Sequence, residues 1–314
     1  MRDESTMSAA VRLTSSVEAL AALAAHLRVE SEQLDVDDRV RELLAAAARE
    51  IVGGARENGE RRAPVDRNDR GAAPTADKAS EAVVGMARSF LRQATDLIEH
   101  PARSNTWDHV DEALLQGIGR LSMAITDAFR AAENLLPGLN ERLSATGSAF
   151  LDVGTGTGWL AIGIARTYPQ ARVVGLDIFE PALDLARRNV AAEGLDGRIE
   201  LRLQNVADLS DVGTYDAIWM ALPFLPLDIV PDALDACRRA LRPGGWLLPG
   251  TFAAPPDPVS QLLLELRTVR AGGHPWTAEE LVNTLSSHGM LDAQEVPRTW
   301  AAPVRLYAAR TRWA

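Results

Sequence analysis

The sequence predicts an α/β protein, in which a mostly parallel sheet follows an all-α N-terminal domain. After residue 148, short apolar runs alternate with helical patterns, which is typical of a parallel sheet covered by helices on both faces. Before residue 145, the apolar residues recur at helical spacing and no stretch has a convincing strand pattern. We therefore expect a helical region over residues 1–145 and an α/β domain over residues 146–314.

The expected helical region consists of amphipathic stretches that are rich in Ala and Leu, both strong helix formers. The patterns cover residues 17–27, 40–52, 79–99 and 111–136, the last of which is a long helical region. Residues 53–78 are polar with scattered Gly and Pro, which predicts a linker or a mobile loop.

The α/β domain is expected to contain a series of apolar strands and then a different tail. The strands are expected at residues 149–153, 172–177, 199–204, 217–221 and 245–250, and the helices between them at 160–167, 181–193 and 231–241. In the tail, a Thr277-x-x-Glu280 capping box opens a helix that runs to residue 288. Extended runs at 293–298 and 304–310 predict an antiparallel pair at the edge of the sheet, because they lie close together in sequence.

The charge balance limits the partners of the chain. Its 314 residues have a formal net charge of −10 and a pI of about 5.1. Phosphate groups are bound by clustered Lys and Arg, so we expect neither a nucleic acid nor an anionic membrane as a partner. No apolar run approaches the ~20 residues of a membrane span, and the first residues lack the order of a signal peptide.

Cysteine and histidine usage predicts a cytoplasmic protein without a metal site. Cys237 is the single cysteine, which excludes a disulfide within the chain. Its place in a helical pattern predicts a buried thiol rather than a nucleophile. The five histidines show no metal-ligand spacing.

One stretch, FLDVGTGTGWL, combines a strand, a glycine turn and a helix start. Gly154, Gly156 and Gly158 let the backbone pass close to a ligand and adopt positive φ. Asp177 ends the next expected strand, and an acid about 20 residues after a glycine loop is placed to bond ribose hydroxyls. Trp159 occupies the sixth place, where a dinucleotide site has Gly or Ala, and the Gly-Lys-Ser/Thr of a P-loop is absent. The pattern therefore predicts an adenosine cofactor other than a dinucleotide.

Asp152 and the glycine turn after it, in the pattern D-x-G-x-G-x-G, resemble motif I of the class I S-adenosylmethionine-dependent methyltransferases. Further motifs follow in the family's order: Asp177, then the segments QNVADL, YDAIW and LRPGGW. The resemblance covers residues 145–312. It implies a Rossmann-like, seven-stranded, mostly parallel sheet whose last strand inserts antiparallel, with S-adenosyl-L-methionine as the cofactor.

The resemblance also implies cofactor-binding roles. The methionine end of the cofactor would lie against the glycine turn, with its ammonium near Asp152, and Asp177 would hold the ribose. Asn205 and Val206 would frame the adenine, with Ile178 or Phe179 packed on its face. The alternative for Phe179 is a place in the core. Asn205 stands where the family usually has Asp, and an amide can still bond the adenine amino group. The full predicted set is Asp152, Gly154, Thr155, Gly156, Gly158, Asp177, Ile178, Asn205 and Val206.

The acceptor side is predicted from the residues after the fourth strand, which read MALPFLP. In the family, members that methylate nucleobases and glutamine have Asn/Asp-Pro-Pro-Tyr/Phe here, and the first side chain grips a planar amino group. Ala221 or Leu222 takes that place in this chain, which argues against methylation of an exocyclic amine or an amide. Leu222 and Phe224 instead suit a hydrophobic small acceptor. The alternative interpretation is that Phe224 and Leu225 only anchor the loop.

A second candidate region precedes the long helical pattern and includes Trp107, Asp108 and His109. We expect it to fold over the cofactor and to close the acceptor pocket, with Trp107 against the substrate. His109 is the best candidate for a catalytic base, because the pKa of histidine lies near neutrality. Asp108 is a further catalytic candidate, and Arg120 is placed to pair with an acceptor carboxylate. The alternatives are that Asp108 or Asp111 caps the helix, that His109 is solvated, and that Arg120 forms a salt bridge.

Two glycines, Gly117 and Gly119, interrupt the same helical pattern. Each costs roughly 1 kcal/mol relative to alanine in a helix. Such a departure from local preference tends to mark close packing or a functional site.

Together these patterns predict a methyltransferase for a small, partly hydrophobic metabolite, with transfer to oxygen or carbon favoured. The helical region would serve as a cap and as the contact of a homodimer. Usage that is rich in Ala and Arg and poor in Lys indicates a high-GC bacterial source and a role in secondary metabolism. The alternatives are a protein or peptide methyltransferase, with an open groove beside residues 53–78, and a non-catalytic cofactor-binding protein that assembles through its helices.

Overall fold

The fold is that of a computed structural model, which describes residues 2–58, 78–254, 256–300 and 302–313. The chain divides into two compact units. The helical unit comprises Met1–Ser104 and Ala254–Arg267, and the sheet unit comprises Asn105–Ala253 and Thr268–Ala314. The division therefore falls at residue 104 rather than at the expected 145, because the helices between these positions pack with the sheet.

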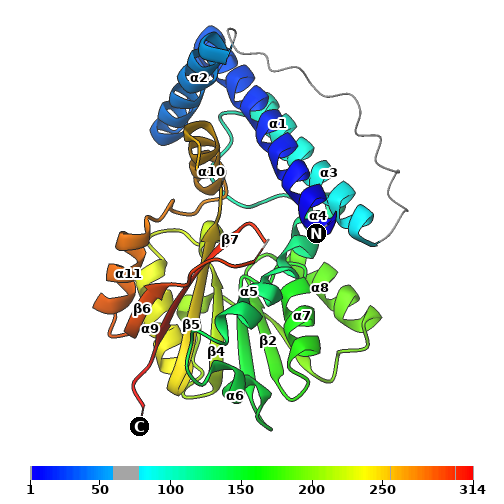
Figure 1. Ribbon diagram of the computed structural model, residues 1–314, viewed down its shortest axis with the longest axis vertical. Helices are drawn as coiled ribbons and strands as arrows, with labels where there is room; N and C mark the ends of the chain where they lie inside the picture. The colour runs from blue at the N-terminus through cyan, green and yellow to red at the C-terminus, as the bar shows by residue number, and fades with distance from the viewer. Residues whose placement is uncertain (1, 59–77, 255, 301, 314) are drawn as a thin grey trace. The chain divides into compact units, whose positions relative to one another are not determined.

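The helical unit is built from long helices. They are α1 (Arg2–Glu32), α2 (Asp38–Asn58), α3 (Lys78–Glu99) and α10 (Pro258–Arg270). The part of α10 after Arg267 belongs to the sheet unit. Figure 1 shows α1 beside α3, and α1 also contacts α2. Ala22 and Ala25 of α1 are fully buried, and their small side chains allow close approach of the helices.

Two features of the helical unit differ from the expected pattern. α10 has no counterpart among the expected elements. It contacts α2, because Glu265 of α10 pairs with Arg39 of α2 at 2.9 Å. Residues 53–58 of the expected loop continue α2, and residues 59–77 lie outside the described residues.

The sheet unit contains a seven-stranded sheet in the order β3-β2-β1-β4-β5-β7-β6. Its strands are β1 (Ala149–Val153), β2 (Arg172–Asp177), β3 (Ile199–Leu203), β4 (Tyr215–Ala221), β5 (Leu241–Phe252), β6 (Leu291–Glu295) and β7 (Val304–Arg310). β7 is antiparallel to both of its neighbours, whereas β1 to β5 pair in parallel. The predicted fold class is confirmed, and β6 lies slightly ahead of its expected range.

Helices cover both faces of the sheet (Figure 1). One face has α5 (Ile125–Ala132), α7 (Trp159–Thr167) and α8 (Glu180–Ala192), and the other has α9 (Val230–Ala240) and α11 (Ala278–Ser287). Each layer has its own core, with Phe129 and Ile162 in the first and Leu234 and Leu281 in the second. The sheet therefore lies between two apolar layers, as its continuous apolar strands predict.

The expected helical region over 111–136 is interrupted. α4 (Glu112–Ser122) ends before Met123, and α5 begins at Ile125. A Cβ at Gly163 of α7 would lie 2.7 Å from Thr126 Cγ2 of α5, so the two helices approach closely at this glycine. The break thus allows α5 to change direction and pack on α7. A short helix, α6 (Leu139–Ser144), follows before β1.

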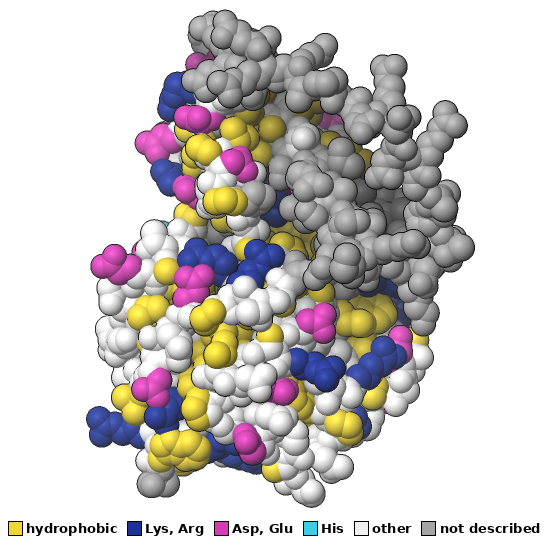
Figure 2. All heavy atoms as spheres, in the orientation of Figure 1, with side chains coloured by type: hydrophobic (Ala, Val, Ile, Leu, Met, Phe, Trp, Pro, Cys, Tyr) yellow, Lys and Arg dark blue, Asp and Glu magenta, His cyan; other side chains and the backbone are white. Residues whose placement is uncertain are grey.

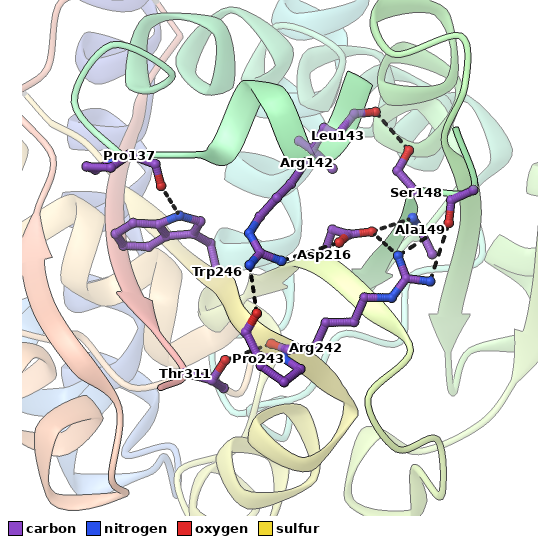
Figure 3. Close-up of polar contacts among 11 residues, drawn as sticks. Pro137, Arg142, Leu143, Ser148, Ala149, Asp216, Arg242, Pro243, Trp246 and Thr311 are labelled. Atoms are coloured by element: carbon purple, nitrogen blue, oxygen red, sulfur yellow. Dashed lines mark hydrogen bonds and ion pairs between the residues drawn. The ribbon is translucent and has the colours of Figure 1, made fainter. Parts of the chain in front are cut away.

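A polar cluster joins the amino ends of β1, β4 and β5 (Figure 3). Asp216 is 5% exposed, and its Oδ2 accepts hydrogen bonds from Ala149 N, at 3.0 Å, and from Arg242. Arg142 approaches the other carboxylate oxygen at 3.6 Å and donates to Pro243 O at 2.7 Å. Both oxygens of this buried carboxylate therefore have cationic partners.

Candidate active site

The glycine turn follows β1 at the carboxyl edge of the sheet. Gly154, Gly156 and Gly158 have φ values of 76°, 54° and 79°, in the left-handed region that favours glycine. A Cβ at Gly154 would lie 3.3 Å from Ala221 Cβ at the end of β4, and one at Gly158 would lie 3.1 Å from Ala186 Cβ of α8. A Cβ at Gly156 would meet nothing within 4 Å. The outer glycines therefore allow close packing, whereas Gly156 borders open space.

Asp177 connects the glycine turn with the end of β2. Its Oδ2 accepts a hydrogen bond from Gly156 N at 2.8 Å, and its Oδ1 accepts one from Phe179 N at 2.9 Å. Gly154 N donates to Leu176 O at 2.9 Å. Burial raises the pKa of Asp177, and the backbone donors lower it in opposition. The glycine turn is therefore joined directly to the acid that ends β2.

Asp152 is a fully buried carboxylate at the end of β1. Thr155 Oγ1 donates to Asp152 Oδ2 at 2.8 Å, while Oδ1 accepts no hydrogen bond from the described residues. Burial is the main cause that raises the pKa of Asp152 to about 7. The charge of Asp177 adds to the rise, whereas the hydrogen bond from Thr155 and the backbone of Ala161 lower the pKa in opposition. A buried carboxylate with one oxygen unsatisfied is unfavourable as an anion, and a cationic group of a ligand beside Oδ1 would offset that cost.

The predicted adenine-binding residues lie after β2 and β3. Asn205 is the N-cap of the 3-10 helix η1 (Val206–Asp208), and its Oδ1 accepts from Ala207 N at 3.0 Å. Its carboxamide oxygen is therefore engaged locally, and Val206 is buried. Ile178, next to Asp177, is 71% exposed, which leaves a large apolar side chain able to pack on a planar ring.

Four rings, called the aromatic group below, lie near the end of β4: Trp107, His109, Phe224 and Phe252. The ring centroid of Trp107 is 4.9 Å from that of His109 and 5.0 Å from that of Phe224, both in edge-on contacts. Phe224 contacts Phe252 at 5.8 Å. All four side chains are half-buried. Sequence reasoning missed Phe252, because the end of β5 has no motif that distinguishes it from a core strand.

Leu222 does not belong to the aromatic group. It is the first residue of the 3-10 helix η2 (Leu222–Phe224), and its side chain is 0% exposed in the core beneath α9. The prediction that Leu222 contacts the acceptor is therefore wrong, because the turn of η2 directs this side chain into the core. Phe224 is the residue of η2 that contacts Trp107.

The remaining predicted catalytic residues lie in or before α4. Asp108 is exposed. The Arg120 guanidinium lies over the Trp159 ring, 5.0 Å from its centroid. Asp111 caps α4, since its side chain accepts from Leu114 N at 2.7 Å, which agrees with the capping alternative. The catalytic roles of Asp108 and Arg120 stay predictions.

Other features of the described residues limit the chemistry of the site. Cys237 is fully buried, as expected, and burial raises the pKa of its thiol to about 12, which makes it a poor nucleophile. Within the described ranges, no three His, Cys, Asp or Glu side chains are grouped as metal ligands. None of the described helices has the length and apolarity that a bilayer crossing requires. Figure 2 shows basic and acidic side chains interspersed over one face of the sheet unit.

Comparisons with known proteins agree with this geometry. Residues 150–245 match a family model described as a methyltransferase domain. A release factor glutamine methyltransferase of Deinococcus radiodurans is 32% identical over 237 residues, 63% of this chain and 82% of the relative. A demethylmenaquinone methyltransferase of Thermus thermophilus is 39% identical over 106 residues, 34% of this chain and 48% of the relative. The chain spans less than half the length of some curated relatives, 40% and 48% in two of them.

A similar fold occurs among solved structures. The structure of a putative O-methyltransferase from Nostoc punctiforme PCC 73102 superposes with a TM-score of 0.54 at 16% identity, over 97% of this chain and 95% of that one. Identity at this level supports the fold alone. Together with the glycine turn, the two carboxylates and the sheet order, the relatives define the class: the chain belongs to the class I S-adenosylmethionine-dependent methyltransferases. Its cofactor is S-adenosyl-L-methionine.

Proposed function

We propose that the protein transfers a methyl group to an oxygen or carbon atom of a small, partly hydrophobic acceptor in bacterial secondary metabolism. The position of the aromatic group is the observation that supports this acceptor. Ala221 lies against Gly154 of the glycine turn, and η2 with Phe224 follows directly after Ala221. An acceptor held by these half-buried rings would therefore lie beside the cofactor loop. Aromatic side chains of this kind favour an acceptor with an apolar body.

In this proposal the buried carboxylates hold the cofactor. Asp152 Oδ1, which accepts no hydrogen bond from the described residues, would receive the ammonium group. Asp177 would bond the ribose hydroxyls at the end of β2, and the open space at Gly156 would admit the methionine portion. Ile178, with Asn205 and Val206, would frame the adenine. When bound, S-adenosylmethionine would supply a methyl group on a sulfonium. An aligned nucleophilic atom of the acceptor would attack the methyl carbon in line, and the sulfur would leave as a neutral thioether.

His109 is proposed as the base. Transfer to a hydroxyl or to a carbon acid requires removal of the acceptor's proton. The contact of the His109 ring with Trp107, within the aromatic group, supports this role, because the imidazole would then lie beside the proposed acceptor. The neutral imidazole would take the proton as the acceptor atom bonds to the methyl group. Trp107 and Phe224 would orient the acceptor and exclude water.

Methylation of a glutamine side chain in a protein is the second candidate, because the chain resembles a release factor glutamine methyltransferase over most of that relative. The residues after β4 weigh against it. Ala221 and Leu222 stand where glutamine-methylating members have the side chain that grips the amide, and Leu222 is buried in the core. A non-catalytic assembly role is a weaker alternative, because Asp177 and the glycine turn have an intact geometry.

We also propose that the protein is a cytoplasmic homodimer that associates through the helical unit. Leu20 and Leu27 of α1 are 69% and 61% exposed, and Leu91 of α3 is 52% exposed. Leu20 and Leu27 are seven residues apart, so they lie on one face of α1. Exposed leucines on one helical face favour burial against a second copy. Sedimentation velocity of the full chain would show whether it is a monomer or a dimer.

A labelled-methyl assay tests the proposed acceptor class. The protein would be incubated with methyl-labelled S-adenosylmethionine and two panels, one of phenols, enols and carbon acids and one of glutamine-containing peptides. We expect label in the first panel. With a responsive acceptor, His109→Gln should lower kcat/KM by about 100-fold or more while cofactor affinity is kept. His288→Gln, at the C-cap of α11, is the matched control and should keep full activity.

Three results would each contradict part of the proposal. Label found in the peptide panel alone would transfer the assignment to a protein methyltransferase. Unchanged turnover in the His109→Gln variant, with an active wild type, would remove His109 as the base. Binding of S-adenosylmethionine without label in either panel would favour the non-catalytic alternative.

A further inference from the structure

We propose that Gln116 of α4 is a positioning residue that holds the cofactor loop from outside the Rossmann-like core. It acts through Trp159 and Asn189, which flank the glycine turn on α7 and α8. The inference deepens the proposed function at the cofactor side, and it depends on the cofactor but not on the identity of the acceptor.

A set of hydrogen bonds joins Gln116 to both flanking helices. Trp159 Nε1 donates to Gln116 Oε1 at 2.7 Å. Gln116 and Asn189 exchange two bonds, from Gln116 Nε2 to Asn189 Oδ1 at 3.0 Å and from Asn189 Nδ2 to Gln116 Oε1 at 3.2 Å. Asn189 Nδ2 also donates to Thr157 O, inside the glycine turn, at 2.8 Å. Three elements that are distant in sequence are therefore fixed through one carboxamide.

Close packing at Gly119 supports the same arrangement independently. A Cβ at Gly119 would lie 1.8 Å from Thr157 Oγ1 and 3.1 Å from Trp159 Cδ1. Thr157 lies between two positive-φ glycines and is 2% exposed. The backbone of α4 therefore rests directly on the loop. This contact explains why the helix keeps a glycine at this position despite its lower helix propensity.

The arrangement has a consequence for cofactor binding. Alternating glycines leave a turn with many accessible backbone conformations, and ordering them on binding reduces affinity. Asp177 fixes one side of the turn through Gly156 N. Gln116 and Gly119 fix the other side through Trp159 and Thr157. The tryptophan in the sixth place, which argues against a dinucleotide turn, thus receives a role: its indole N–H is the point at which α4 holds the loop.

A double-mutant cycle read by calorimetric binding of S-adenosylmethionine tests this role. We expect Gln116→Leu to raise the Kd about tenfold, because the loop must be ordered on binding. Trp159→Phe should raise it by a smaller factor, and the double variant should bind no more weakly than Gln116→Leu, since both changes remove the same bond. With a responsive acceptor, KM for the cofactor should rise while kcat changes little. Ser122→Ala is the control: it removes a bond within α4, from Ser122 Oγ to Gly119 O at 2.6 Å, and should leave the Kd unchanged.

The melting temperature of each ligand-free variant separates positioning from simple support of the fold. A lower melting temperature with an unchanged Kd in Gln116→Leu would overturn the proposal, as would effects of the two substitutions that multiply in the double variant. A wild type that binds the cofactor but methylates no small molecule would defeat the proposed acceptor and leave this inference intact.

Discussion

Two buried aspartates on the neighbouring strands β1 and β4 have opposite surroundings. Asp152 is 0% exposed and Asp216 is 5% exposed. Asp216, at the amino edge of the sheet, is bonded by Ala149 N and by two arginines (Figure 3). Asp152, near the carboxyl edge, receives one bond from Thr155 and keeps one oxygen without a partner among the described residues.

The difference shows how the two roles can be told apart. Residue type and burial are the same, so neither identifies a ligand-binding carboxylate. A buried polar group that serves the fold is satisfied within the fold, as Asp216 is. A buried group that stays partly unsatisfied and has a strongly raised pKa is a candidate for a functional site, as Asp152 is. The partners of each carboxylate therefore separate a structural residue from one that awaits a cation.

Replacement of Asp216 by Asn should have the largest effect on stability. The amide keeps an acceptor for Ala149 N but removes the charge that pairs with Arg142 and Arg242, which are 18% and 37% exposed. Breaking a buried ion pair costs about 3–5 kcal/mol, and partial hydration of the arginines reduces this, so we expect a loss of about 2–3 kcal/mol. Urea unfolding measures the loss. Asp184→Asn, in a surface pair with Arg187, is the matched control and should lose less than about 0.5 kcal/mol.

Asp216 is expected to stabilise the fold without contributing to cofactor binding. The folded Asp216→Asn protein should therefore bind S-adenosylmethionine as the wild type does. A loss of about tenfold in affinity, equal to about 1.4 kcal/mol, would show that the amino edge also shapes the site and would remove the contrast.

Replacement of Asp152 by Asn should reverse the pattern. We expect cofactor affinity to fall about tenfold, or about 1.4 kcal/mol, because the ammonium loses a buried anionic partner. Thr155 can still donate to the amide oxygen, so the ligand-free protein should be as stable as the wild type at neutral pH. Calorimetry and urea unfolding on the same preparation measure both quantities. Unchanged affinity together with reduced stability would assign Asp152 a purely structural role.

The sequence predicts one of these aspartates and not the other, for a physical reason. Asp152 and Asp177 lie at the ends of apolar strands at fixed distances from the glycine turn, and local spacing suffices to place them at one edge of a parallel sheet. Asp216 lies in the segment YDAIW, which marks the start of the fourth strand but gives no sign of the partners of its carboxylate. Its importance arises only when Arg142 and Arg242, distant in sequence, reach the same point.

The acceptor side was less predictable, because it depends on tertiary direction rather than on spacing. Leu222 and Phe224 are two residues apart in the same apolar loop, yet η2 buries the first and leaves the second against Trp107. Phe252 joins them from β5 without a motif. The glycine at position 119 predicted close packing correctly, but the sequence could not show that its partner is Thr157.

The last expected effect is a pH dependence of stability that belongs to Asp152. Its pKa rises from an ordinary value of 3.8 to about 7 in the ligand-free fold. Between these values the folded protein holds a proton that the unfolded chain has released, so the contribution of Asp152 to stability falls as pH rises, by at most about 1.4 kcal/mol per pH unit. Asp177, whose pKa is also raised, acts in the same direction. The unfolding free energy of the wild type and of Asp152→Asn would be measured against pH, and the difference between the two slopes isolates the contribution of Asp152.

The affinity for the cofactor should depend on pH in the opposite direction to stability. An ammonium beside Asp152 favours the ionised carboxylate, so binding near pH 6 should release a proton, and affinity should rise with pH until the pKa near 7 is passed. Calorimetry in two buffers with different ionisation enthalpies measures the released proton directly. In Asp152→Asn this release should disappear, whereas in Asp216→Asn it should persist, because the arginines at the amino edge take no part in it. Equal proton release in all three proteins would mean that another group titrates on binding, and the unpartnered oxygen of Asp152 would then lose its proposed role.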